Sequence, residues 1–187
     1  MKKTLTALTL AICAIGSAQA APVQWTVGAG GNDHWYEYVA GPATWSAART
    51  AALASTYGGM TGYLATLTSA AENMFASLLA ANGTALAWIG LTDQAVEGTF
   101  QWIDGPEAGQ VVGYTSWNTS EPNNCCNGED YVHTNYGGAG RWNDHGGPTS
   151  PNLAHGYLVE YNVPEPMTLA LVASALLAGA LTRRRRA

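Results

Sequence analysis

Away from its two ends, the chain has almost no basic residues. Only Arg49 and Arg141, of its eight Lys and Arg residues, lie between residues 21 and 162, whereas all 13 acidic residues except Glu165 lie there. Proteins that bind nucleic acid or anionic membranes concentrate lysine and arginine on the binding face. This composition therefore excludes nucleic acid as a partner and suits the binding of cations.

Cysteine is also scarce, with three residues in the chain. Cys13 lies in an N-terminal segment that we expect to be removed, which leaves the adjacent pair Cys125 and Cys126. Neighbouring cysteines cannot join distant strands, although they can form a vicinal bridge or cross-link to another chain. The sequence also has no zinc-type spacing, phosphate loop or serine-nucleophile motif, so no enzyme is predicted.

The first twenty residues have the pattern of a secretory signal peptide. Lys2 and Lys3 precede an apolar stretch, residues 5–15, and the small-residue sequence Ala18-Gln19-Ala20 follows. An N-terminal membrane helix is the alternative, but the apolar stretch is too short to span a bilayer. We expect the mature protein to begin near Ala21 and to be exported.

The C-terminal segment, residues 163–187, has three parts in a fixed order. Pro164-Glu165-Pro166 precedes an apolar stretch, residues 167–181, and four arginines, residues 183–186. This order resembles the PEP-CTERM sorting signal of Gram-negative bacteria that make exopolysaccharide. The resemblance implies a transient C-terminal membrane anchor, processing by an exosortase, and delivery to the cell surface or extracellular matrix. A permanent tail anchor is the alternative, and it leaves Pro-Glu-Pro without a role.

Residues 21–162, between these ends, have the length of one domain. A first helix is predicted in the N-terminal part of this domain. Thr44 is a typical N-cap, and Trp45, Ala48 and Ala52 fall on one helical face. The pair Gly58-Gly59 predicts the end of this helix.

A second helix is predicted from a capping box. Ser69 caps the helix and Glu72 reaches back to the first turn. Phe75, Leu78 and Leu79 are expected to face inward, and Asn82-Gly83 is expected to end the helix.

Short strands account for most of the remaining pattern. They are predicted at residues 34–39, 63–66, 88–91, 100–103, 131–133 and 157–161 and in the segment entering Asn143, with a long irregular stretch at 105–127. Two helices combined with short strands and long loops predict an α+β domain.

Oxygen ligands are concentrated in three short motifs of the loop-rich part. These are Glu121-Pro122-Asn123, Glu129-Asp130 and Trp142-Asn143-Asp144. Calcium takes six to eight oxygen ligands from carboxylates and carbonyls. Side chains two residues apart in an extended loop leave on the same side, and Pro122 permits a cis peptide bond at low cost. The motifs therefore predict a calcium site.

An ordered series of motifs resembles the C-type lectin-like domain over residues 25–162. The series consists of Thr44-Trp45-Ser46-Ala47-Ala48-Arg49, Gly62-Tyr63-Leu64-Ala65-Thr66, Glu72-Asn73, Trp88-Ile89-Gly90-Leu91, Trp102, Trp117, Glu121-Pro122-Asn123, Trp142-Asn143-Asp144 and Tyr157-Leu158-Val159-Glu160-Tyr161. The resemblance implies an α+β fold with two helices, small antiparallel sheets and a long ligand-binding loop region. Trp142 is expected in the core rather than as a sugar platform.

The chain departs from this family in its cysteines. The usual disulfides would fall at Ala52 with Val159 and at Tyr131 with Gly147, and none of these is cysteine. Because both partners of each pair are missing, we interpret the chain as a disulfide-free version. Each lost bridge typically removes a few kcal/mol, which packing and calcium would have to supply.

The resemblance implies one set of residues for both metal and sugar. Glu121, Asn123, Glu129, Asn143 and Asp144 would bind Ca²⁺ and, in its open positions, two vicinal hydroxyls of a saccharide. The order Glu-Pro-Asn resembles mannose-type members, which also take glucose and fucose, rather than galactose-type members. His145 is expected to line this site or face solvent.

A second, auxiliary calcium site is also implied by the family resemblance. Its residues would be Asp93, Glu97, Asn124 and Asp130. Asn124 stands where an aspartate is usual, which lowers the negative charge, and the alternative is a set of solvated surface acids.

The sequence therefore favours a calcium-dependent carbohydrate-binding protein that acts on a saccharide or exopolysaccharide. The rival hypothesis is a structural or protein-binding adhesion module in which calcium only orders the loop.

Overall fold

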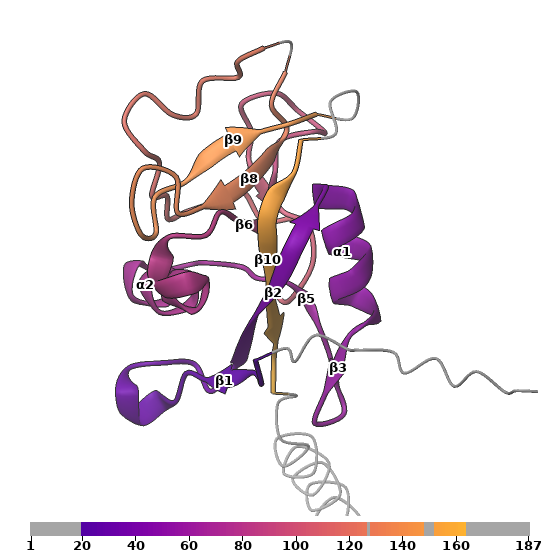
Figure 1. The fold of residues 1–187 in the computed structure, drawn as a ribbon, viewed down its shortest axis with the longest axis vertical. Helices are drawn as coiled ribbons and strands as arrows, with labels where there is room; N and C mark the ends of the chain where they lie inside the picture. The colour runs from indigo at the N-terminus through magenta and orange to yellow at the C-terminus, as the bar shows by residue number, and fades with distance from the viewer. Residues whose placement is uncertain (1–19, 127, 148–151, 164–187) are drawn as a thin grey trace, which may run out of the picture.

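A computed structural model of the chain describes residues 20–126, 128–147 and 152–163 (Figure 1). The elements in chain order are β1 (Val23–Gln24), η1 (Val27–Ala29), β2 (Trp35–Ala43), α1 (Trp45–Ala54), β3 (Thr56–Tyr57), β4 (Met60–Thr61), β5 (Tyr63–Leu64), α2 (Ala70–Leu79), η2 (Ala81–Gly83), β6 (Ala87–Thr92), β7 (Gln101–Trp102), β8 (Tyr131–Thr134), β9 (Asn143–His145) and β10 (Ala154–Tyr161). The predicted signal peptide and C-terminal segment lie outside the described residues, except for Ala20 and Val163. Within the described part, no helix is long and apolar enough to cross a membrane.

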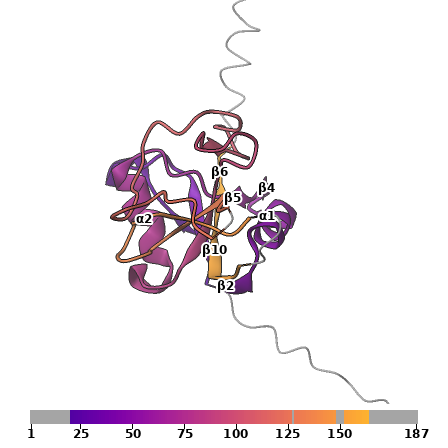
Figure 2. The same ribbon diagram turned by 90° about the horizontal axis from the view of Figure 1, so that it is seen from above.

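Strand β10 is the centre of the main sheet. It pairs antiparallel with β2, from Ala154 opposite Ala43 to Tyr161 opposite Trp35, and parallel with β6. The strand order is β1-β2-β10-β6-β8-β9, while β5 adds to β10 and β7 adds to β6. Helices α1 and α2 lie on opposite sides of the β2–β10 pair (Figures 1 and 2). The α+β fold predicted from the sequence is confirmed.

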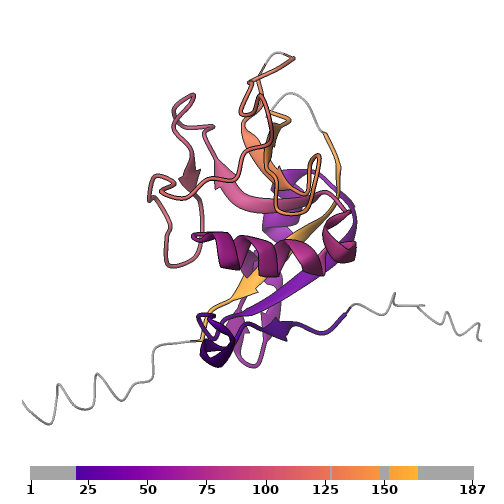
Figure 3. The same cartoon turned by 90° about the vertical axis from the view of Figure 1, so that its left-hand side faces the viewer.

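The two poles of the domain differ in structure. Strands β8 and β9 and the long loops lie at one pole, whereas β1 and the last residues of β10 lie at the other (Figure 1). Figure 3 shows α2 lying across the sheet between these poles. The loop-rich pole contains the predicted ligand motifs.

Helix α1 begins as predicted and ends earlier. The Thr44 hydroxyl accepts the Ala47 N–H at 3.2 Å, and Trp45, Ala48 and Ala52 are buried. The prediction that Gly58-Gly59 ends the helix is wrong. Both glycines have positive φ and form the turn between β3 and β4, since hairpin turns of this kind need left-handed backbone.

Helix α2 has the predicted cap, but its buried face is polar. The Ser69 hydroxyl accepts the Glu72 N–H at 3.2 Å. The buried residues are Glu72, Asn73, Ala76 and Ser77, whereas Leu78 is 43% exposed. The prediction that Leu78 faces inward is therefore wrong. The polar side chains are buried because each hydrogen-bonds to another element, a pattern that hydrophobic periodicity does not detect.

The prediction for the C-terminal end of α2 is also wrong. The helix ends at Leu79, and Asn82 and Gly83 lie in the short 3-10 turn η2 that follows. Asn82 has a φ of 55°, which asparagine tolerates better than most residues, so the pair continues the turn after the helix has ended.

Glu72 and Glu160 form a buried acidic network between α2 and the sheet. Tyr36 donates its hydroxyl to Glu72 at 2.6 Å, and the ring Nδ1 of His34 lies 2.6 Å from Glu160. Glu160 also accepts the Thr66 N–H at 2.9 Å. Burial raises the pKa of Glu160, and the hydrogen bond from His34 opposes that increase. These contacts explain how two carboxylates occupy the interior.

Apolar packing replaces the missing disulfides. Ala52 and Val159, one of the positions where the family has a bridge, are fully buried in the same hydrophobic cluster. At the other position, Tyr131 stacks on Trp45 with ring centroids 4.5 Å apart. The indole N–H groups of Trp45 and Trp88 donate to backbone carbonyls at 2.8 and 2.7 Å, so these buried aromatics have satisfied polar atoms.

Candidate functional site

The long loop enters the site beside the segment that leads to β9. The Asn118 N–H donates to the Trp142 carbonyl at 2.8 Å, and the Trp142 N–H donates to the Ser116 carbonyl at 2.8 Å. Trp142 is fully buried, as expected for a core residue. The peptide bond between Glu121 and Pro122 is cis.

Asp144 on β9 receives this loop. Its Oδ1 accepts the Asn123 N–H at 3.1 Å, and its Oδ2 accepts the Asn124 N–H at 2.8 Å. The side chain is 1% exposed, because β8 pairs with β9 at Val132 and the loop covers the other side. The structure thus brings Asn123 and Asp144 together across 21 residues of chain.

Glu129 reaches the same loop through the amide of Cys125. The Cys125 N–H lies 2.8 Å from Asn123 Oδ1 and 3.0 Å from Glu129 Oε2, and both oxygens can accept it. Asn124 Oδ1 accepts the Glu129 N–H at 2.8 Å. Cys125 is disulfide-bonded to Cys126. Of the two alternatives expected for this pair, the structure therefore has the vicinal bridge rather than a cross-link to another chain. Sequence reasoning did not identify this backbone amide, since no side-chain pattern marks it.

Glu121 is the carboxylate whose charge is least compensated. Its Oε2 is buried and has no hydrogen-bond partner. Burial and the neighbouring charges of Asp144 and Glu129 raise the pKa of Glu121. A buried carboxylate oxygen without a partner is costly unless a cation or donor approaches it. A cation beside Glu121 would offset this cost.

Asn143 is the predicted ligand that the structure does not join directly to the others. Its amide nitrogen lies 3.3 Å from Nε2 of His133, and burial lowers the pKa of His133 to about 4. Across the described residues, no three His, Cys, Asp or Glu side chains are arranged to hold a metal by themselves. Amide and backbone oxygens would have to complete a coordination shell.

His145 lines the site, one of the two outcomes expected for it. Its Nδ1 lies 3.3 Å from Glu129 Oε1, and its ring packs edge-on against His133 at 5.4 Å. The same ring stacks on the buried Trp88 with centroids 6.1 Å apart. The His145 ring therefore contacts Glu129 while it packs against His133 and Trp88.

The predicted auxiliary residues gather at a neighbouring position. Asp93 Oδ2 accepts the Gly98 N–H at 2.8 Å, while its Oδ1 is buried without a partner. Burial raises the pKa of Asp93 to about 6, with the charges of Glu97 and Asp130 adding to the increase and the Gly98 hydrogen bond opposing it. Asn124 faces Glu129 instead. Three of the four predicted residues thus influence one another electrostatically.

The model of the "Lectin C-type domain" family matches residues 43–151. The chain belongs to this family. The C-type lectin domain described here is similar to halomucin of Haloquadratum walsbyi, with 34% identity over 79% of the chain and 2% of halomucin. It is also similar to the alpha-N-acetylgalactosamine-specific lectin of Patiria pectinifera, with 42% identity over 44% of the chain and 50% of that lectin.

Solved structures of C-type lectins have the same fold. The C-type lectin CEL-I from Cucumaria echinata superimposes with a TM-score of 0.56 and 29% identity, covering 71% of this chain and 92% of CEL-I. Family members are generally carbohydrate-binding, non-enzymatic proteins, and C-type lectin domains typically bind calcium. This C-type lectin domain spans half or less of the length of both curated relatives.

Proposed function

We propose that this domain binds saccharides through a calcium ion held by Glu121, Asn123, Glu129, Asn143 and Asp144. The observation that carries the proposal is the buried, unpartnered Oε2 of Glu121 beside the charges of Asp144 and Glu129. Membership in a family whose domains typically bind calcium supports it.

The residues of the loop would have complementary tasks. The Asp144 carboxylate orders residues 123 and 124 through their N–H groups, and the Cys125 N–H orients Asn123 and Glu129. Glu121 contributes the oxygen that no protein donor satisfies. A bound calcium would supply open coordination positions for two sugar hydroxyls. The carboxylates and amides would then hydrogen-bond the same hydroxyls.

The sugar class follows from the loop motif and from a relative. Glu121-Pro122-Asn123 resembles mannose-type members and favours mannose, glucose or fucose. The Patiria pectinifera relative is named for alpha-N-acetylgalactosamine. We therefore propose vicinal hydroxyls of a mannose-type sugar, with N-acetylgalactosamine as the competing probe.

A glycan array with calcium, repeated with a chelator, tests the proposal. We expect mannose-type ligands to bind in calcium and to bind far more weakly in the chelator and in Glu121→Gln. Glu37→Gln on β2, far from the loop, is the matched control and should keep binding. Sugar binding that persists undiminished in the chelator for all ligands would overturn the calcium mechanism. Calcium-dependent stabilisation without any glycan binding would favour the adhesion module instead.

We also propose where the protein acts. Residues 1–20 would be a signal peptide, residues 21–162 the lectin domain and residues 163–187 the PEP-CTERM segment. Export, transient membrane anchoring and exosortase processing would place the domain at the bacterial surface or in the exopolysaccharide matrix. Fractionating cells that express the full chain and a variant lacking residues 183–186 tests this. Identical distribution of both proteins would argue against the sorting role.

A further inference from the structure

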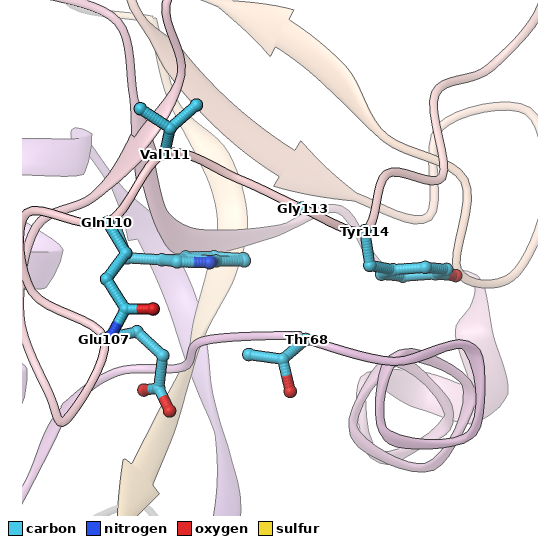
Figure 4. A pocket seen from close by; sticks show the side chains of 7 residues that line it. Thr68, Glu107, Gln110, Val111, Gly113 and Tyr114 are labelled. Atoms are coloured by element: carbon cyan, nitrogen blue, oxygen red, sulfur yellow. The ribbon is translucent and has the colours of Figure 1, made fainter.

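A cavity of about 390 Å³ lies apart from the predicted calcium ligands. Its lining residues are Thr68, Trp102, Glu107, Gln110, Val111, Gly113 and Tyr114 (Figure 4). Thr68 directly precedes the cap of α2, and the other residues belong to β7 and the loop that follows it. The volume is at the lower end of the roughly 300–1,000 Å³ typical of small-molecule sites.

The walls of the cavity combine aromatic and hydrogen-bonding groups. Tyr114 and the 59% exposed Val111 supply apolar surface, and Trp102, which is 3% exposed, lies behind them. In Figure 4 the Glu107 carboxylate and the Thr68 hydroxyl point the same way, with the ring of Tyr114 on the far side of Thr68 from Glu107. Such walls match a ligand that has both apolar faces and several hydroxyl groups.

Glu107 is held in place by one hydrogen bond and can accept further ones. The Thr66 hydroxyl donates to Glu107 Oε2 at 3.0 Å, and this is the carboxylate's one hydrogen bond among the described residues. The second oxygen is left to accept a hydrogen bond from a ligand. Bonds from hydroxyls to a carboxylate are about twice as strong as neutral ones.

The charge around the cavity determines which ligands it accepts. None of its lining residues is cationic. Arg49, on α1, is bound to Asp104 by two hydrogen bonds of 2.7 and 2.9 Å. Glu107 acts on the same buried groups as Glu72 and Glu160, so the negative charges lie near one another. Phosphates, sulfates and uronic acids would be repelled, whereas a neutral polyol that donates hydrogen bonds would not.

We propose that this cavity is a second saccharide-binding site, which takes a neutral sugar unit without calcium. The apolar face of the sugar ring packs against the aromatic wall, and its hydroxyls donate to Glu107 and exchange hydrogen bonds with Gln110. The Thr68 hydroxyl, which donates to Glu72 Oε2 at 2.7 Å, accepts a further hydrogen bond from the sugar. The site is independent of the calcium proposal, because none of its residues belongs to the predicted calcium set.

The two sites are close enough in the fold to act on one polymer. Tyr114 packs edge-on against Trp142 with ring centroids 5.6 Å apart, and Trp142 precedes Asn143 and Asp144 in the chain. A polysaccharide that reaches both sites would bind the second one intramolecularly, which raises its overall affinity.

Substitution of Gly113 tests the proposal, because a side chain can be added there without a steric clash. A Cβ on Gly113 meets no atom within 4 Å, and the same holds for Gly28 in η1, far along the chain from the cavity. Gly113→Leu would obstruct the cavity, and Gly28→Leu is the matched control for the same substitution at an open glycine. Glu107→Gln keeps the shape and removes the charge.

The measurement is titration calorimetry of the full-length protein in a chelator, with mannotriose, maltotriose and chitotriose as probes. We expect at least one probe to bind, with a loss of about tenfold or more in Gly113→Leu and Glu107→Gln. Gly28→Leu should bind like the unmodified protein, and Glu121→Gln should as well, which separates this site from the calcium site. No binding of any probe in chelator, or equal binding by Gly113→Leu and Gly28→Leu, would overturn the proposal.

Discussion

The indole N–H of Trp142 donates to the side-chain carbonyl of Asn73 at 2.8 Å. The amide of Asn73 in turn donates to the Gly140 carbonyl at 2.8 Å, and both side chains are buried. Helix α2 therefore fixes the residue that leads into Asn143 and Asp144. Polar side chains of this helix therefore hold in place the backbone that leads into the candidate site.

Replacing Asn73 by alanine should destabilise the domain by about 2–3 kcal/mol, because it leaves the Trp142 N–H and the Gly140 carbonyl buried without partners. Urea unfolding monitored by tryptophan fluorescence measures the change. Met74→Ala is the control, since Met74 is 44% exposed on the same helix and should change stability by less than about 0.5 kcal/mol. Similar midpoints for both variants would contradict the supporting role of Asn73.

Glu121→Gln should have opposite effects without and with calcium. Without calcium the melting temperature should rise by a few degrees, about 1 kcal/mol, because the substitution removes a buried charge that Asp144 and Glu129 repel. With calcium the stabilisation seen in the unmodified protein should be largely lost. Differential scanning fluorimetry with calcium and with a chelator measures both. A calcium-free variant less stable than the unmodified protein would contradict this account of Glu121.

The stability of the domain should fall as the pH rises above about 6.5, the ordinary pKa of histidine. Burial alone lowers the pKa of His34, but the hydrogen bond and charge of Glu160, with Glu72 and Glu107, raise it overall. A raised folded-state pKa means that stability is present below the unfolded pKa and is lost as pH rises through the folded one. The raised pKa of Glu160 acts in the same direction.

His34→Gln tests this pH dependence. The glutamine can still hydrogen-bond to Glu160 but does not titrate, so the decline in unfolding free energy above about pH 6.5 should flatten. Urea titrations at several pH values measure it. His155→Gln is the control, because His155 is exposed and its hydrogen-bond partner among the described residues is the Leu86 N–H. An unchanged slope in His34→Gln would remove His34 from the explanation.

Replacing Cys125 and Cys126 together by serine should leave global stability within about 0.5 kcal/mol. A bridge between adjacent residues closes no long loop, so it removes little entropy from the unfolded chain. The calcium affinity should nevertheless weaken, because without the bridge the backbone at residues 125 and 126 is less constrained, and the N–H of residue 125 that contacts Asn123 and Glu129 is held less firmly. Urea unfolding and calcium titration separate the two effects. A large loss of stability with unchanged calcium affinity would reverse this assignment.

The order of the motifs was sufficient to predict the fold, because each motif marks a local structural feature such as a helix cap or a buried strand. Thr44 and Ser69 cap their helices as predicted, and Trp88 to Leu91 form a buried strand. Phe75 and Leu79 pack against the core as predicted, but the helix ends and the buried polar residues of α2 could not be predicted. Burial of Glu72 and Asn73 depends on partners that are distant in the sequence, such as Tyr36 and Trp142, and hydrophobic spacing contains no information about them.

The candidate site was predictable to a similar extent. The spacing of Glu121, Asn123, Glu129 and Asp144 indicated that they converge, and the structure brings these four together. Two contributors were beyond the sequence. The role of the Cys125 amide depends on backbone geometry, and the contact between Asn143 and His133 depends on the pairing of β8 with β9.

The first and last strands of the domain pair with the same residue. Gln24 on β1 and Tyr161 on β10 both lie opposite Trp35, one on each side of β2. The polypeptide therefore enters and leaves the domain at the same pole, and the loops with the predicted ligands lie at the opposite pole (Figure 1). A stalk attached where the chain enters and leaves, on either flank, would hold the domain upright with its loops facing outward, and neighbouring copies could stand side by side without covering one another's loops.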